Sequence, residues 1–161
     1  TKPVDVDAIV ITGSRRNVTM WEDWMDDVVE LIRKTTIPLY GICFGHQIIA
    51  HALGGKVERA EEDWHFVAEV VDESGDAIIA SFAHQEYVVD AGELEVIASS
   101  DHCKIAACKH PTRPIHTVQY HPEAVSAVLD AALSCGDMNH EERSAYDDKR
   151  LTTDVSIAFD L

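Results

Sequence analysis

Apolar and polar positions follow two different periods in the first third of the chain. Residues 8–12 form a short β-rich apolar run closed by a glycine, which predicts a buried strand that enters a tight loop. Across residues 21–32 the apolar side chains recur at spacings of three and four, which predicts a helix with one apolar face. Thr19 with Glu22 three residues later matches a capping box for that helix.

A second strand and a second helix follow directly. Residues 37–43 read as a strand, and residues 46–53 resume helical spacing until Gly54 and Gly55 end it. The order strand, helix, strand, helix with short connections predicts an α/β domain with a largely parallel sheet.

The middle of the chain contains short strand candidates between turn signals. They cover residues 66–71, 77–80, 94–98, 104–108 and 115–119. A last helix is expected from Pro122, a favoured first-turn residue, to about Leu133, with Gly136 as its end. We therefore assign residues 1–136 to one domain and the polar residues 137–161 to a C-terminal tail.

Composition limits the class of protein. The chain has 161 residues, 46% of them hydrophobic, which fits one globular domain. We find neither an apolar run long enough for a membrane helix nor a secretion signal, so the expected compartment is the cytoplasm.

The charge balance changes this picture further. Asp and Glu number 29 against 13 Lys and Arg, a formal net charge of −16. Such a surface repels nucleic acid and anionic membranes, so neither is an expected partner. Salt screens the self-repulsion, and we favour a halophilic protein over an ordinary acidic one.

One cysteine stands in a distinctive setting. Gly41-Ile42-Cys43-Phe44-Gly45 places a nucleophile between glycines at the predicted strand-to-helix junction. A sharp turn there projects the side chain above the sheet, and the N-terminus of the next helix favours thiolate over thiol. The alternative for this motif alone is a buried, inert cysteine.

The remaining thiols and imidazoles carry no comparable signal. Cys103, Cys108 and Cys135 form no CxxC pair, so we interpret them as small hydrophobic residues. The histidines outside the motifs lack a second ligand at metal spacing. We expect no metal and no other cofactor.

The wider context resembles a known family. Residues 40–47 read YGICFGHQ and residues 119–123 read QYHPE, similar to the two main motifs of the class I (triad) glutamine amidotransferases. Residues 11–14 resemble the family's glycine loop, and residues 83–86 its intervening His-containing segment. The resemblance covers residues 7–123, and the two motifs in this order are highly specific.

The resemblance implies a Cys–His–Glu triad. Cys43 would attack the side-chain amide of L-glutamine and form a thioester, His121 would transfer protons, and Glu123 would orient the imidazole. Further candidates for oxyanion or substrate binding are Gly13, Ser14, Phe44, Gln47, His84 and Gln85. The first three would act through backbone N–H groups, Gln47 would line the pocket, and the last two have a structural turn as the alternative.

The resemblance also implies a three-layer, flavodoxin-like α/β fold with a mostly parallel sheet. The chain lacks the N-terminal strand-helix-strand unit that the family usually has, which would leave an open sheet edge. Either the chain is a fragment, or another segment fills the gap. A second copy in a homo-oligomer and the apolar run at 155–161 are the candidates.

Three functions remain open at this point. The favoured one, on the specificity of the two motifs, is a GMP-synthase-like glutaminase that passes ammonia to a synthetase. The sequence shows no ATP-binding motif such as a P-loop, so the ammonia acceptor is not expected within it. The alternatives are a γ-glutamyl hydrolase-like enzyme and a truncated, non-catalytic binding domain.

Overall fold

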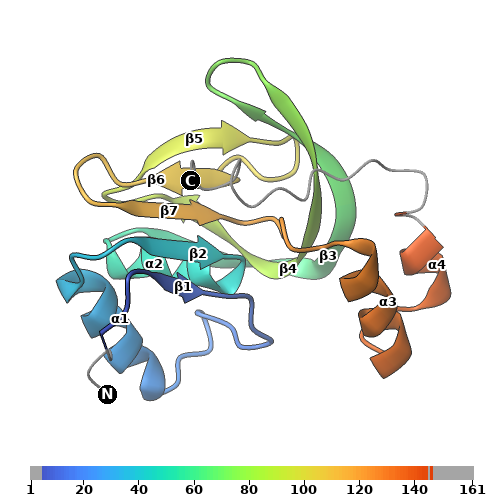
Figure 1. Cartoon of the computed structure of the whole chain (residues 1–161), viewed down its shortest axis with the longest axis horizontal. Helices are drawn as coiled ribbons and strands as arrows, with labels where there is room; N and C mark the ends of the chain where they lie inside the picture. Colours follow the sequence, from blue (N-terminus) through green and yellow to red (C-terminus); the bar gives the residue numbers. More distant parts are fainter. Residues whose placement is uncertain (1–4, 145, 147–161) are drawn as a thin grey trace.

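The computed structural model describes residues 5–144 and 146, and it consists of one sheet with flanking helices (Figure 1). The elements in chain order are β1 (Ile9–Ile11), α1 (Trp24–Lys34), β2 (Leu39–Ile42), α2 (Phe44–Ala52), β3 (Lys56–Asp72), β4 (Ala77–Asp90), β5 (Glu95–Ser99), β6 (Ala107–Lys109), β7 (Ile115–Val118), α3 (Ser126–Cys135) and α4 (His140–Ser144). The α/β prediction is confirmed.

The seven-stranded sheet is mixed, with the order β1-β2-β7-β6-β5-β3-β4. The strand pairs β1–β2 and β2–β7 are parallel, whereas the other four pairs are antiparallel. The prediction of a mostly parallel sheet is therefore wrong in this respect. Parallel neighbours need long crossovers, and the chain from β3 to β7 contains short turns in place of helices.

Strands β3 and β4 form one long antiparallel hairpin that curls around the end of the sheet (Figure 1). The short strands expected at 66–71 and 77–80 are only its tip. The charged residues scattered through Lys56–Asp72 hide the strand from a hydrophobicity pattern. Pairing with β4 along most of its length supplies the backbone hydrogen bonds that stabilise it.

Helix α1 begins later than its capping signal suggests. Its N-terminal flanking residue is Asp23, which makes no side-chain cap. The predicted capping box is wrong because the Thr19 hydroxyl donates to Glu86 on β4. At the far end of α1, Arg33 and Lys34 occupy the last turn, where cations complement the helix dipole.

Helices α1 and α2 pack on one face of the sheet around a core that includes Met25, Ile32, Ile48 and Ile49, each fully buried. A second apolar cluster, with Phe82 and Val118 at its centre, joins the strands and Cys43. Within the described residues, no helix is long and apolar enough to cross a membrane.

The two ends of the described chain differ in how they are packed. Strand β1 lies at an edge of the sheet and Val10 is 53% exposed. Tyr146, beyond α4, is buried against Ala124 and Leu129. The run at 155–161 lies outside the described residues, and the domain boundary at 136 stays a prediction.

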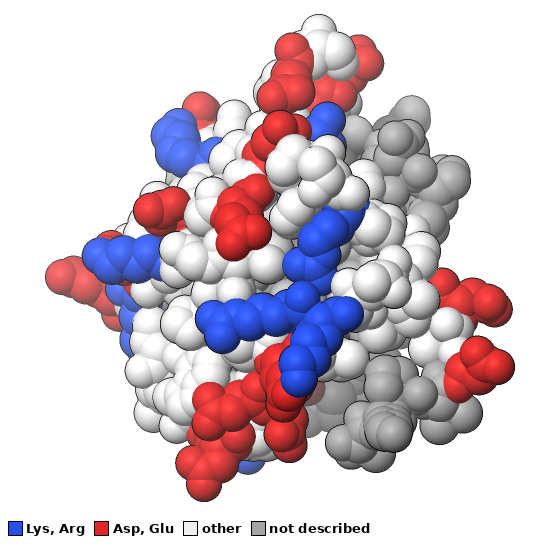
Figure 2. All heavy atoms as spheres, turned by 90° about the vertical axis from the view of Figure 1, so that its left-hand side faces the viewer, with Lys and Arg blue, Asp and Glu red and all other residues white. Residues whose placement is uncertain are grey.

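Basic side chains are not spread evenly over the acidic surface. On the face shown in Figure 2, Lys and Arg gather across the middle, with Asp and Glu around them. Two arginines bond to helix ends: Arg33 donates to the Ala52 carbonyl at the end of α2, and Arg113 donates to carbonyls of Ile32 and Thr35 at the end of α1. Cations thus complement the C-terminal ends of both helices.

Candidate active site

Cys43 lies at the junction of β2 and α2 in a strained backbone conformation. Its φ is 53° and its ψ is −104°, and among the described residues it alone combines a side chain with positive φ. Its N–H donates to the Val118 carbonyl on β7 over 2.9 Å. Strain of this kind, on the order of 1–3 kcal/mol, persists only where the surrounding structure enforces it.

The neighbouring glycines permit close packing around this elbow. A β-carbon on Gly45 would lie 1.9 Å from the Ile11 carbonyl oxygen, and one on Gly41 would lie 2.8 Å from the Gly45 backbone. Neither glycine has positive φ, because the turn places that conformation on Cys43 itself. The glycines are required for space, not for conformational freedom.

His121 and Glu123 form a bonded pair after β7. The His121 Nδ1 atom lies 2.7 Å from the Glu123 Oε1 atom, which leaves Nε2 as the nitrogen for a reacting group. The His121 N–H donates to the Ser81 carbonyl on β4 over 2.8 Å, which fixes the loop against the sheet. The carboxylate thus sets the tautomer and the orientation of the ring, which is the arrangement that a nucleophile–base–acid triad requires.

Electrostatics favour a protonated His121. Burial lowers the pKa of His121, but Cys43 and Glu123 outweigh that effect and raise it to about 10. Burial also raises the pKa of Glu123, and the bond to His121 overcomes this and leaves it lowered. A protonated imidazole that is bonded to Glu123 and faces Cys43 can give up a proton to a reacting group.

The loop at Gly13 comes close to both His121 and Cys43. A β-carbon on Gly13 would lie 3.1 Å from the His121 Cε1 atom and 3.7 Å from the Cys43 Cβ atom. Phe44 opens α2 directly after Cys43, where the first backbone N–H groups lack helical partners. The geometry therefore gathers Gly13, Phe44 and the triad in one place.

The other predicted positions lie around this centre in different ways. Ser14 is exposed and its hydroxyl accepts from the Arg16 N–H. His84 is buried on β4, and its Nδ1 lies 2.7 Å from the Glu86 carbonyl oxygen. Gln85 is half-buried and, by strand alternation, points to the other face. The structure does not bring the side chains of His84 and Gln85 together.

Gln47 is buried and bonded within the protein. Its Nε2 donates to the Glu86 carbonyl over 2.7 Å and to the Gln119 side-chain oxygen over 3.2 Å. His46, one residue earlier, is fully buried with Nδ1 at 2.8 Å from the Thr117 hydroxyl. Burial lowers the pKa of His46 to about 3, so this ring is neutral.

Sequence reasoning missed this buried polar network, and in particular Glu86. Glu86 is 1% exposed on a strand whose inward positions otherwise hold residues such as Phe82 and Val88. The sequence does carry a signal for it: a carboxylate at an inward position of an alternating strand is buried, and a buried carboxylate needs hydrogen-bond donors.

The other cysteines are set apart from this chemistry. Burial raises the pKa of Cys103 and of Cys108 to about 12, so both stay protonated thiols. Cys135 is exposed at the end of α3. Among the described thiols, the elbow position is particular to Cys43.

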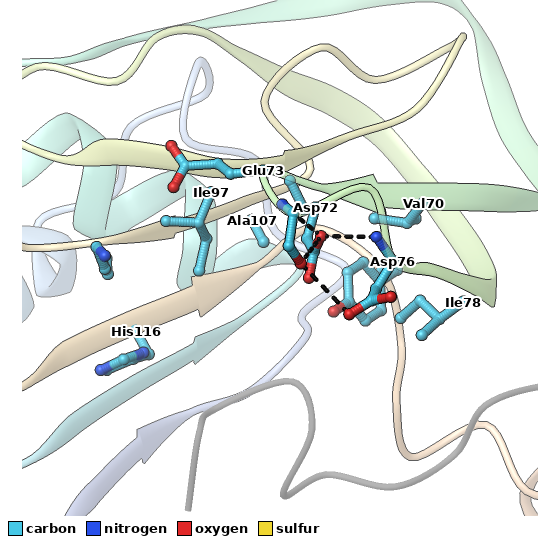
Figure 3. Close-up of a pocket in the computed structure, with 12 residues that line it drawn as sticks. Val70, Asp72, Glu73, Asp76, Ile78, Ile97, Ala107 and His116 are labelled. Carbon is cyan, nitrogen blue, oxygen red and sulfur yellow. Dashed lines mark hydrogen bonds between the residues drawn. The ribbon is translucent and has the colours of Figure 1, made fainter.

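A cavity of about 460 Å³ lies elsewhere, over the strands (Figure 3). An acidic turn borders it, where Asp72 accepts from the backbone N–H groups of Ser74 and Asp76. Apolar side chains such as Val70 and Ile97 line its floor. No triad residue lines this cavity, and the acidic turn is stabilised by its own bonds, so we do not assign the chemistry to it.

Comparison with known proteins agrees with this geometry. The family model for class-I glutamine amidotransferases matches residues 2–134. A glutamine-hydrolysing GMP synthase subunit from Methanocaldococcus jannaschii is 38% identical over 104 residues, covering 59% of this chain and 55% of the relative. A glutamine-hydrolysing GMP synthase from Lactobacillus acidophilus is 33% identical over 132 residues, covering 76% of this chain and 25% of the relative.

Solved structures show the same fold. A structure described as a GMP synthase subunit from Thermoplasma acidophilum superposes with a TM-score of 0.66 and 26% identity, over 73% of this chain and 64% of that one. A glutamine amidotransferase from Thermotoga maritima superposes with a TM-score of 0.70 and 16% identity, over 96% and 69%. The chain spans little more than half the length of two GMP synthase subunits that it matches, 55% and 56%. The chain belongs to the class I glutamine amidotransferase family.

Proposed function

We propose that this chain hydrolyses L-glutamine to L-glutamate and ammonia through Cys43, His121 and Glu123. The observation that carries the proposal is the strained elbow at Cys43 beside an imidazole that is itself bonded to Glu123. A strained nucleophile costs stability, so its presence next to a base of raised pKa supports a chemical role.

The reaction follows from the charges. The Cys43 thiolate attacks the side-chain amide carbon of glutamine, and the oxyanion that forms is held by backbone N–H groups of Phe44 and of Gly13 or Ser14. His121 gives its proton to the leaving nitrogen, so ammonia departs and a thioester remains. Neutral His121 then takes a proton from water, which attacks the thioester and releases glutamate and the thiolate.

The ammonia acceptor belongs to the same proposal. The named relatives are glutamine-hydrolysing GMP synthases or subunits of such enzymes. We therefore propose that a synthetase that makes GMP, on a separate chain or a further domain, receives the ammonia. The acidic composition supports a halophilic, cytoplasmic setting for this partnership, because multimolar salt screens the net charge of −16.

Glutamate release from L-glutamine in multimolar KCl tests the proposal. We expect activity in the wild-type chain, none above background in Cys43→Ala, and wild-type activity in the matched control Cys135→Ser, whose thiol is exposed and outside the site. Activity on γ-glutamyl peptides with none on glutamine would favour the hydrolase alternative. A folded wild-type chain inactive on both substrates, also with the synthetase added, would favour the binding-domain alternative.

A further inference from the structure

Glu86 is a buried carboxylate that the proposed reaction does not use. It lies on the inward face of β4 and is 1% exposed. Burying an ionised carboxylate is unfavourable unless hydrogen bonds replace its water. The identity of the donors to Glu86 therefore indicates its structural role.

The donors come from the loop between β1 and α1. The Val18 N–H donates to Glu86 Oε2 over 2.6 Å, the Thr19 N–H donates to Oε1 over 3.1 Å, and the Thr19 hydroxyl also donates to Oε1. Within the described part of the chain, no lysine or arginine forms an ion pair with Glu86. The carboxylate is thus held by loop groups and not by a counter-charge.

The main chain of Glu86 joins one further element, α2, to this point. Its carbonyl accepts from Gln47 Nε2 on α2 over 2.7 Å, and it lies 2.7 Å from His84 Nδ1 on β4. Gln47 sits one turn after the nucleophile on α2. One residue of β4 therefore connects the loop before α1 with α2, the helix that follows Cys43.

The other end of the same loop reaches the reacting groups. A β-carbon on Gly13 would lie close to both His121 and Cys43, and Val18, five positions later, is buried and bonded to Glu86. A loop fixed at β1 and again at residues 18–19 has little freedom between these points.

We propose that Glu86 is a positioning residue for the proposed glutaminase, on which this inference rests: its carboxylate fixes the β1–α1 loop so that the Gly13 and Ser14 N–H groups face the oxyanion formed at Cys43. Oxyanion donors act on charge that develops in the transition state. Their misplacement lowers kcat more than it raises KM.

Glu86→Gln tests the assignment, because it keeps the shape but turns an NH₂ group toward N–H donors. We expect kcat to fall roughly ten- to a hundredfold with KM within about twofold. The matched control Glu69→Gln changes an exposed carboxylate on β3 and should keep wild-type kinetics.

Two further readouts separate positioning from general damage. In a Cys135→Ser background, alkylation of Cys43 by iodoacetamide needs no oxyanion site, so its rate should stay within about twofold of wild type. Trypsin should cut faster at Arg15 and Arg16, whose side chains are 82% and 65% exposed in the loop. Faster cutting at all sites alike, with slower alkylation, would mean general unfolding and overturn the proposal.

A milder substitution keeps the test valid if Glu86→Gln does not fold. Thr19→Val removes the hydroxyl donor and keeps both N–H donors, and it should lower kcat in the same direction by about threefold, with faster cutting at Arg16. Unchanged kcat in Glu86→Gln would overturn the positioning role. If the wild-type chain does not hydrolyse glutamine, the proposed function fails, while the trypsin experiment still decides whether Glu86 fixes the loop.

Discussion

A β-carbon on Gly13 would meet the imidazole of His121, although more than a hundred positions separate the two residues in the chain. At that point the loop after β1 leaves less space beside the Cε1 edge of the ring than an ordinary van der Waals contact needs. The proposed oxyanion loop and the proposed base therefore depend on each other's position.

Gly13→Ala tests this contact. A β-carbon would meet His121 Cε1 at 3.1 Å, so the loop or the ring must move by a few tenths of an ångström. Because small displacements of reacting groups are costly, we expect kcat/KM for glutamine to fall about tenfold or more. Thermal unfolding should change little, since Gly13 is only half-buried. Wild-type kcat/KM in Gly13→Ala would contradict the predicted role of this loop.

Glu123→Gln should change the pH dependence of the reaction. Against the effect of burial, Cys43 and Glu123 hold the pKa of His121 at about 10. Without the carboxylate that pKa falls by roughly one to three units, so the protonated form is lost at lower pH. We expect the alkaline limb of the kcat profile between pH 7 and 10.5 to move to lower pH. A limb that stays in place would mean that a group other than His121 controls it.

Stability at alkaline pH follows from the same shift. A histidine whose pKa is raised from 6.5 to about 10 in the folded state stabilises the fold fully below pH 6.5. That contribution is lost as the pH rises through about 10. Denaturant unfolding of the wild type and of Glu123→Gln across this range should show a shallower alkaline loss in the variant.

His46 should destabilise the fold in acid. Burial lowers its pKa from 6.5 to about 3, so the unfolded chain binds a proton that the folded chain does not. The unfolding free energy therefore falls as the pH drops below 6.5, by about 2 kcal/mol at pH 5 from this residue. His46→Asn should have a flatter stability profile between pH 7 and 5. Equal slopes in the two proteins would contradict a neutral, buried His46.

Salt should stabilise the protein. A net charge of −16 repels itself, and KCl screens that repulsion. A gain of about 2 kcal/mol between 0.2 and 2 M KCl would raise Tm by roughly 4–8 °C in a domain of this size. Sucrose, which strengthens burial without screening charge, is the control. An equal gain in sucrose would argue against the halophilic interpretation.

The elbow and the His-Pro-Glu segment could be predicted because their signals are local. Gly41 to Gly45 are consecutive in sequence, so the motif can be recognised before the partners that crowd it, such as Ile11, are known. Cys43, His121 and Glu123 followed from the resemblance, and the structure brings them together.

Features that depend on partners far away in the chain could not be predicted from the local sequence. Thr19 has the local pattern of a helix cap, but its hydroxyl bonds to a carboxylate 67 positions away. The buried carboxylate gains more from three donors than the helix gains from one cap, so the long-range bond determines where α1 begins. Similarly, β3 is a strand because β4 pairs with it, whatever its own charge pattern favours.

The conformation of Cys43 has a consequence for substitution at that position. At most positions in helices and strands, a protein with alanine is more stable than the same protein with glycine. At a φ of 53° this order of stability should reverse. The fold itself disfavours any residue with a β-carbon here, and only its chemistry would keep cysteine in place. In a descendant released from catalysis, position 43 is where drift toward glycine should appear first, which makes this residue a marker of whether a lineage still uses the reaction.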